Sequence, residues 1–226
     1  MSSSVRYHHY LPFLTGMFVA VVLVSGIVST KIINVWGLHL DGGTLLFPLS
    51  YIFGDILTEV YGYKRSRIVI WTGLVAMVIM SVMIILIGVM PVGGEWPHQE
   101  SYNNVLMLAP RIFLASIIAY TVGEFVNSYI IAKLKIHTRG KHLWLRLIGS
   151  TVVGQLIDTI LFVVIAFAGL IGQGELFMIA LSTYIFKIVL EVILFPFTKY
   201  VITRLKTTEK VDHFDHDTDF NPFVLD

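Results

Sequence analysis

The sequence has 226 residues, of which 56% are hydrophobic and only 14% charged, and its formal net charge at pH 7 is +1. Such a chain needs lipid around it, because its polar residues are too few to cover the surface of a water-soluble domain. It has no cysteine, which excludes disulfides and thiolate chemistry, and no segment is left for an ATPase domain or a glycine-rich phosphate loop.

Apolar stretches long enough to cross a bilayer follow one another along the chain, since a helix needs roughly 20 residues to do so. There are six, at 11–33, 45–61, 68–90, 112–134, 144–169 and 176–205. The first is too long for a signal peptide, and the last is long enough to tilt or to kink at Pro196. The sequence therefore predicts an all-α membrane protein with an N-terminal segment 1–10, a six-helix transmembrane domain 11–205 and an acidic, histidine-containing tail 206–226.

Basic residues alternate from loop to loop. Lys64, Arg65 and Arg67 follow the second stretch, and the loop after the fourth stretch and the tail are also basic, whereas 34–44, 91–110 and 170–174 contain no Lys or Arg. Short basic loops stay on the cytoplasmic side of a membrane. Both termini are therefore predicted to be cytoplasmic, with Lys64, Arg65 and Arg67 as topology anchors.

The tail alternates histidines with aspartates, as in His213, Asp215 and His216, which on paper resembles a set of metal ligands. The stretch is rich in Asp and offers no regular structure to hold such ligands. The sequence therefore favours an unstructured, solvated tail, and it predicts neither a metal site nor a cofactor.

Polar residues recur at helical spacing inside four of the apolar stretches. A charge near the bilayer centre costs roughly 2.5 to 3.5 kcal/mol on insertion scales, so these side chains are expected to face a common interior and to have a function. Residues three or four apart share one helical face. The stripes consist of Tyr51, Asp55 and Glu59 in the second stretch, Tyr120, Glu124 and Asn127 in the fourth, Gln155 and Asp158 in the fifth, and Tyr184, Lys187 and Glu191 in the sixth.

Simpler roles exist for part of this set. Lys187 and Glu191 are four residues apart and could neutralise each other, and Gln155 could be an interhelical hydrogen-bond partner. The four carboxylates of Asp55, Glu59, Glu124 and Asp158 outnumber the ammonium groups, so some of them should be protonated, hydrated or reserved for a ligand.

Carboxylates and carboxamides beside Phe47 and several tyrosines suit a flat, polar heterocycle. A guanine-like edge offers neighbouring N–H donors to one carboxylate, a carbonyl oxygen to an amide, and two faces to aromatic rings. Composition alone does not single out this ligand.

Four segments carry a specific family resemblance. They read FPLSYIFGDILTEVYGYKRSR, VGEFVNSYIIAKLK, LWLRLIGSTVVGQLIDTILFVVIAF and YIFKIVLEVILFP. In these segments, and in the FNPF near the end, the chain resembles the queuosine precursor transporter family, also called the vitamin uptake transporter family. The resemblance implies a six-helix protein of the bacterial inner membrane, similar in fold to the substrate-binding components of energy-coupling-factor transporters. It also implies import of 7-deazaguanine precursors of queuosine.

The pattern of that family falls here on Phe47, Pro48, Asp55, Gly62, Ser150, Thr151, Gly154, Asp158, Thr159 and Lys187. In another branch of the family, the positions of Glu124 and Asn127 resemble a Gln followed by an Asp. The positions of Glu59 and Glu191 hold non-acidic residues there. With the polar stripes, the resemblance implies substrate binding by Phe47, Tyr51, Asp55, Glu124, Asn127, Gln155, Asp158 and Lys187. Glu59, Lys187 and Glu191 are expected to serve in coupling or charge balance.

These residues suggest specific roles in an importer. Either Asp158 or Glu124 would bind the guanine-edge N–H groups, Asn127 and Gln155 would bind the carbonyl, and Phe47 with Tyr51 would stack on the ring. The cargo would be 7-cyano-7-deazaguanine, 7-aminomethyl-7-deazaguanine or queuine. Proton symport and facilitated diffusion are both compatible with the sequence.

Two alternatives belong to other classes. The chain could be a substrate-binding subunit that depends on a separate ATP-driven module. An intramembrane protease using Asp55 and Asp158 is disfavoured, because no second motif supports the dyad, and the chain is therefore predicted not to be an enzyme. Expected partners are a purine-like small molecule and the lipid bilayer, with no nucleic acid; a homodimer stays open.

Overall fold

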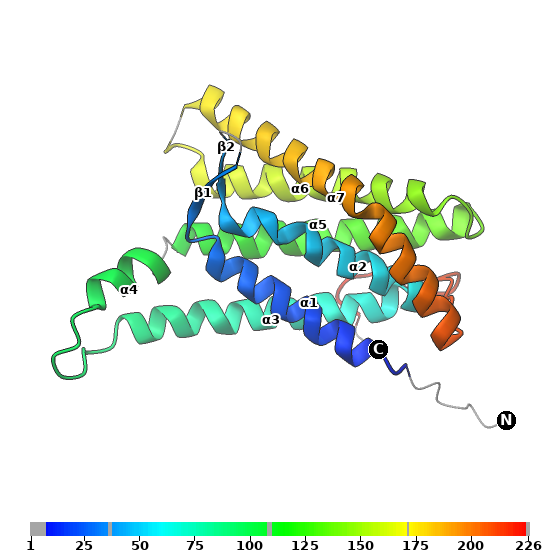
Figure 1. The fold of residues 1–226 in the computed structure, drawn as a ribbon, viewed down its shortest axis with the longest axis horizontal. Coiled ribbons are helices and arrows are strands. Elements are labelled where there is room, and N and C mark those ends of the chain that lie inside the picture. Colours follow the sequence, from blue (N-terminus) through cyan, green and yellow to red (C-terminus); the bar gives the residue numbers. More distant parts are fainter. Residues whose placement is uncertain (1–7, 36–37, 108–109, 171, 225–226) are drawn as a thin grey trace.

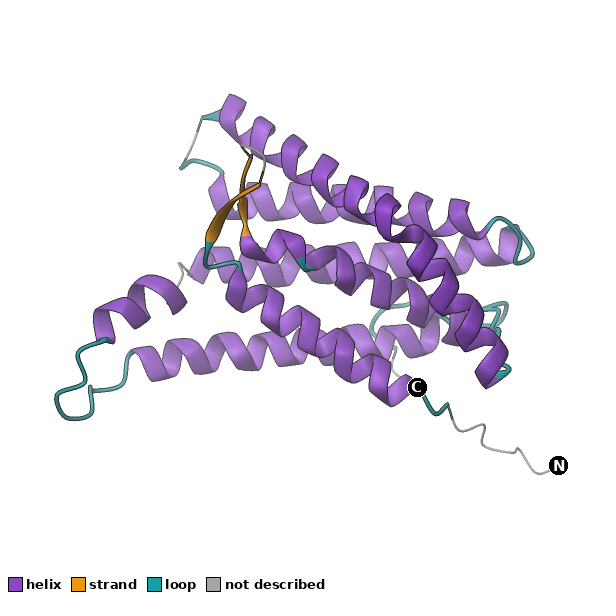
Figure 2. Ribbon diagram, in the orientation of Figure 1, coloured by secondary structure: helices purple, strands orange, loops and turns teal. Residues whose placement is uncertain are grey.

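The computed structural model describes residues 8–35, 38–107, 110–170 and 172–224, and it is built almost entirely of helices (Figure 2). In chain order its elements are α1 (Leu11–Val28), β1 (Ile32–Val35), β2 (Leu38–Asp41), a short 3-10 helix (Gly42–Leu45), α2 (Phe47–Tyr61), α3 (Tyr63–Gly88), α4 (Gln99–Leu106), α5 (Pro110–His137), α6 (Leu143–Phe167) and α7 (Gln173–Glu209). Strands β1 and β2 form an antiparallel hairpin in which Ile32 pairs with Asp41.

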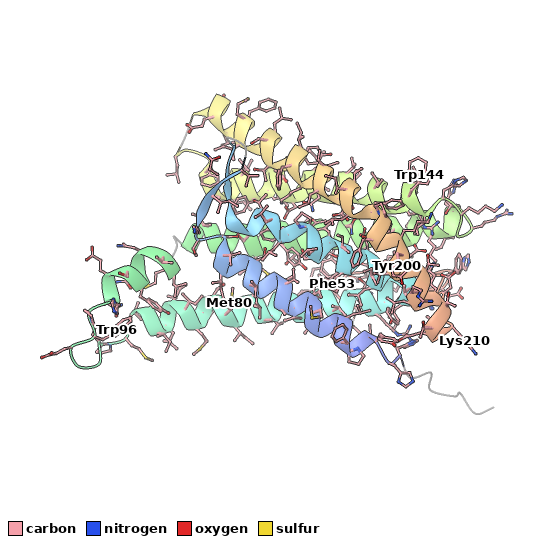
Figure 3. All side chains as sticks on the ribbon, in the orientation of Figure 1. Phe53, Met80, Trp96, Trp144, Tyr200 and Lys210 are labelled. Atoms are coloured by element: carbon pink, nitrogen blue, oxygen red, sulfur yellow. The ribbon has the colours of Figure 1, made fainter. Side chains whose placement is uncertain are left out.

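The long helices run side by side and give the molecule two distinct ends (Figure 1). The hairpin and α4 lie at one end, together with Trp96, while Trp144 and Lys210 mark the other (Figure 3). We call the second the basic end, because α2 and α5 finish there and the cationic residues that follow them gather there. Helix α1 begins at this end and α7 finishes there (Figure 1).

Among the described residues, five helices are long and apolar enough to cross a membrane: α1, α3, α5 from Leu114, α6 and α7. The second predicted stretch is also helical, but α2 has only 15 residues and does not meet that length. The first predicted stretch is too long by five residues, because α1 ends at Val28 and Ile32 already starts the hairpin. The structure thus establishes a helical protein with five candidate spans and a shorter helix among them.

Helix α2 lies in the centre of the bundle. Most of its side chains are buried, polar and apolar alike, whereas α3 and α7 expose valines and isoleucines such as Val75, Ile79 and Ile193 on their outer faces. An apolar face turned outward is what a lipid-facing helix presents, and a helix enclosed on all sides can carry polar groups only where neighbouring helices meet them. The placement of α2 therefore brings its polar stripe into the interior.

The C-terminal segment differs from its prediction as an unstructured tail starting at residue 206. Helix α7 continues to Glu209, and the following residues turn back onto the bundle (Figure 1), where Val211 and Asp215 are buried. The physical reason is that the helix ends supply N–H groups and cations for which an Asp-rich segment is a good partner. Among the described residues no group of three His, Asp or Glu side chains is arranged to hold a metal ion.

Candidate functional site

The four predicted polar stripes meet inside the bundle. Asn127 of α5 donates a hydrogen bond from Nδ2 to Oδ1 of Asp55 on α2, at 2.7 Å. Lys187 of α7 lies 2.5 Å from Oδ2 of Asp158 on α6. The side chains of all these residues are buried. The structure therefore joins α2 to α5 and α6 to α7 through polar contacts at the level where the stripes converge.

Glycines let these helices approach closely. A Cβ on Gly154 of α6 would lie 2.9 Å from the Asn127 side chain and 3.0 Å from the backbone oxygen of Gly123 on α5. A Cβ on Gly123 would collide with the Tyr51 hydroxyl and come within 2.8 Å of Asp158. Backbones that approach this closely need small residues, as membrane helices commonly show. Tyr51, Asn127 and Asp158 are consequently neighbours around the α5–α6 contact.

Lys187 is already paired in this structure. Its ammonium binds Asp158 across the α6–α7 contact and lies 5.3 Å from the centre of the Phe47 ring, a cation–π distance. The alternative in which Lys187 neutralises Glu191 on its own helix is therefore wrong here. Asp158, one of two residues predicted to bind the guanine edge, is engaged by Lys187.

Glu124 has a contrasting environment. It is fully buried, and neither of its carboxylate oxygens has a hydrogen-bond partner among the described residues. Gly54 on α2 makes room for it, since a Cβ there would collide with Oε1 of Glu124. The structure thus holds a carboxylate in the core, facing a glycine, with its full hydrogen-bonding capacity unused.

Further buried polar atoms share this property. Within the described chain the hydroxyls of Tyr51 and Tyr120 and both amide atoms of Gln155 also lack hydrogen-bond partners, as do the hydroxyls of Thr151 and Thr159 and one carboxylate oxygen each of Asp55 and Glu191. A buried polar group left without a partner costs about 1 to 3 kcal/mol. Such groups are rare in folded proteins and often mark functional positions. Their concentration in α2, α5, α6 and α7 makes this region the candidate site, and we call it the polar core.

Aromatic rings line one side of the polar core. Phe47 packs at 6.4 Å from Tyr120, which in turn lies 6.3 Å from Phe18 of α1. The stacking of Phe47 and Tyr51 on a ligand stays a prediction. Phe18 was not predicted as part of the site, because a single Phe in an apolar helix does not stand out from its neighbours. Thr151 and Thr159 were pointed to only by the family pattern.

Glu59 was expected to face the polar core as a companion of Asp55, and the structure corrects this. It accepts hydrogen bonds from Arg146 at 3.1 and 2.8 Å and from Lys206 at 2.6 Å, and Lys135 lies 3.8 Å away. No role was predicted for Arg146, although an arginine inside an apolar stretch indicates a buried partner or a function. Glu59 is thus neutralised at the basic end and is unavailable to a ligand in the core.

The predicted topology anchors differ among themselves. Lys64 is exposed, and Arg65 donates a hydrogen bond to the Tyr61 carbonyl. Arg67 is buried and binds backbone carbonyls of the C-terminal segment, at 2.9 Å from Asp219 and 2.5 Å from Asn221. Within the described part of the chain, none of these three residues forms a hydrogen bond or an ion pair with Asp55 or Glu59.

Comparison with known proteins places the chain in a family. A family model described as a putative vitamin uptake transporter matches residues 41–201, which is more than half of the chain and contains every predicted substrate-binding residue. The chain belongs to the vitamin uptake transporter family. The resemblance seen in the sequence is thereby confirmed. As a member of this family the chain is a transporter, and its apolar helices make it a multi-pass membrane protein.

Relatives of this vitamin uptake transporter come from three bacteria. It is 25% identical to a probable queuosine precursor transporter of Bacillus subtilis over 80% of this chain and 81% of the relative. It is 25% identical to the queuosine precursor transporter of Escherichia coli over 72% of each chain, and 26% identical to a probable queuosine precursor transporter of Haemophilus influenzae over 72% of this chain and 68% of the relative. No solved structure matches it.

Proposed function

We propose that this protein imports a 7-deazaguanine precursor of queuosine across the bacterial inner membrane. The observation that carries the proposal is Glu124, a fully buried carboxylate without a partner among the described residues, in the core of a vitamin uptake transporter. One relative is named a queuosine precursor transporter and two are named probable queuosine precursor transporters, which supports the cargo class.

Hydrogen-bonding chemistry favours Glu124 over Asp158 for the guanine-like edge. An ionised carboxylate accepts two parallel N–H bonds, which matches the adjacent ring N–H and amino group of that edge. Glu124 has both oxygens available, whereas Lys187 binds Asp158. Gln155 then serves the carbonyl, because the Asn127 amide already donates to Asp55.

A six-helix arrangement with both termini in the cytoplasm is part of the proposal. At 1.5 Å per residue α2 is about 22 Å long, shorter than the roughly 30 Å hydrocarbon core. The hairpin and the 3-10 helix directly precede α2 in the chain and can complete the crossing. Non-helical backbone is tolerated at membrane depth when protein surrounds it. The basic end would then face the cytoplasm.

The test of this proposal is uptake by the chain alone in proteoliposomes, with labelled 7-cyano-7-deazaguanine, 7-aminomethyl-7-deazaguanine and queuine as separate cargoes. We expect at least one of them to enter, and guanine to enter more slowly. Binding without uptake would favour a subunit that needs an ATP-driven module. The absence of both binding and uptake would contradict the proposal. An imposed inward proton gradient would distinguish symport, with Asp55 and Glu191 as the coupling candidates, from facilitated diffusion.

Gly54→Ala should impair uptake although it adds a single methyl group. The added Cβ collides with the Glu124 carboxylate and must displace it from its place opposite α2. We expect uptake to fall about tenfold, equivalent to roughly 1.4 kcal/mol.

Gly149→Ala is the matched control for this substitution. The nearest heavy atom to a Cβ at Gly149 of α6 is 4.0 Å away, an ordinary contact distance, so uptake should be unchanged. Equal initial rates for the two variants at equal protein content would show that the position of Glu124 does not matter.

A further inference from the structure

The C-terminal strap, residues 210–223, closes the basic end of the bundle. It leaves the end of α7 and turns back beside the ends of α2, α3 and α5 (Figure 1), and its own residues Val211 and Asp215 are buried. It has no regular secondary structure and appears as loop in Figure 2. Its polar and aromatic contacts with the helices fall into three groups.

The first group is a charge network around Glu59. Asp212 of the strap lies 2.5 Å from the ammonium of Lys135 and 2.9 Å from that of Lys206, the cations that also approach Glu59. Arg146 completes the set, so three cations from α5, α6 and α7 surround one carboxylate of α2 and one of the strap. Burial alone would raise the pKa of Asp212, but hydrogen bonds from Lys135 and Lys206 outweigh it and hold that pKa below its usual range.

The second group covers the junction of α2 and α3. Both carboxylate oxygens of Asp215 lie 3.1 Å from the backbone N–H of Tyr63, the first residue of α3, where a negative charge is favourable. The backbone N–H of His213 donates to the Val60 carbonyl at 3.2 Å. Gly62 between the helices has φ of +87°, and a Cβ there would collide with the His213 ring.

The third group fixes the end of the strap on α3 and α5. Trp71 donates from Nε1 to the Pro222 carbonyl at 2.7 Å, beside the bonds from Arg67. The Phe220 ring lies 5.1 Å from that of Tyr63 and 5.4 Å from that of Tyr129, and the ammonium of Lys133 stands 3.9 Å from its centre. The strap thereby connects α3, α5 and α7.

The charge network lies at the basic end, directly beyond the polar core. Asp55 and Glu59 are one turn apart on α2, and both are fully buried. On α7, Thr198 is 2% exposed and sits between Glu191 of the polar core and Lys206 of the network. A cargo that leaves the core toward the basic end must therefore pass the residues that Asp212 and Glu59 hold together.

We propose that the C-terminal strap is the release gate of the transporter at the basic end, with Asp212 as its latch. This rests on the proposed function, since a transporter opens its site to one side at a time. When Asp212 is docked, two carboxylates balance three cations and the helix ends stay together. When it leaves, Lys135, Arg146 and Lys206 share one carboxylate, and their mutual repulsion separates α5, α6 and α7 around the path. Asp212 is suited to this because its side chain is 46% exposed and can be solvated on leaving.

The absence of cysteine in the chain allows a direct test by thiol accessibility. Thr198→Cys in the full chain provides a reporter on the path, to be labelled in proteoliposomes by a membrane-impermeant maleimide added without cargo. We expect Asp212→Asn to raise the labelling rate about tenfold. Asp212→Glu, which keeps the carboxylate, should label at the parent rate, as should Asp217→Asn, the same change at an exposed position of the strap.

General unfolding is monitored by a second reporter. Ser25→Cys lies in α1 toward the hairpin end, where the Ser25 side chain is fully buried and bonds the Gly43 carbonyl, and it should stay unlabelled in every variant. Equal labelling of Thr198→Cys in the Asp212→Asn, Asp217→Asn and parent backgrounds would overturn the gate, as would increased labelling at both reporters together. Because the assay contains no cargo, its failure is separate from failure of uptake.

Discussion

Glu124→Gln should abolish specific cargo binding while leaving the bundle folded. The substitution preserves shape but replaces a carboxylate that accepts two N–H bonds with an amide that presents a donor to one of the cargo's donors. The variant loses one hydrogen bond to a charged partner, about 1.5 to 3 kcal/mol, and leaves two donors facing each other without a partner, about 1 to 3 kcal/mol more, so binding should weaken by about 100-fold. Titration calorimetry of the detergent-solubilised protein with a 7-deazaguanine, together with uptake in proteoliposomes, measures both consequences.

Glu175→Gln is the control for Glu124→Gln. Glu175 lies in the first turn of α7 at the hairpin end and is exposed, so the same change there should alter neither binding nor uptake. Folding of the Glu124→Gln variant is expected to be retained, because no hydrogen bond to Glu124 from the described residues is removed. Binding of unchanged strength by a folded Glu124→Gln protein would refute the assignment of the guanine-like edge to this residue.

The sequence predicted the helices and their polar faces because both depend on local spacing. Apolar runs of about 20 residues leave few alternatives to a span, and stripes at three and four residues mark a face without any knowledge of neighbours. For α2 the same rule gave a helix but missed how it is enclosed. A run such as that around Ile56 looks the same whether lipid or other helices cover it, so only the packed structure shows α2 as central.

The partners of the buried charges could not be predicted from spacing. Lys187 has Glu191 four residues away on its own helix, yet it binds Asp158 on another, and Glu59 binds cations from three helices instead of facing the polar core. Both outcomes depend on which faces of different helices meet. The strap was missed for a related reason, since Asp212 and Asp215 acquire their partners only where α3 begins and where α5 and α7 end.

The contact between Lys187 and Asp158 should be required for both stability and transport. Lys187 is only 5% exposed and Asp158 only 4%, so either charge without its partner would be left in surroundings that solvate it poorly. Breaking such a buried pair by removing one partner costs about 3 to 5 kcal/mol, whereas replacing both by uncharged groups costs much less. We therefore expect Lys187→Met and Asp158→Asn each to lower the thermal midpoint of the solubilised protein, and the double variant to recover part of the loss.

Transport should respond differently from stability in this pair. The Lys187 ammonium lies 5.3 Å from the centre of the Phe47 ring at the start of α2, so the pair places a cation and a carboxylate beside the aromatic side of the polar core. Asp158→Asn should abolish uptake while the protein still inserts into the membrane, and the double variant should remain inactive even where its stability returns. If uptake in the double variant recovered in parallel with its thermal midpoint, the pair would be a brace for the helices, and the polar core would bind its cargo without it.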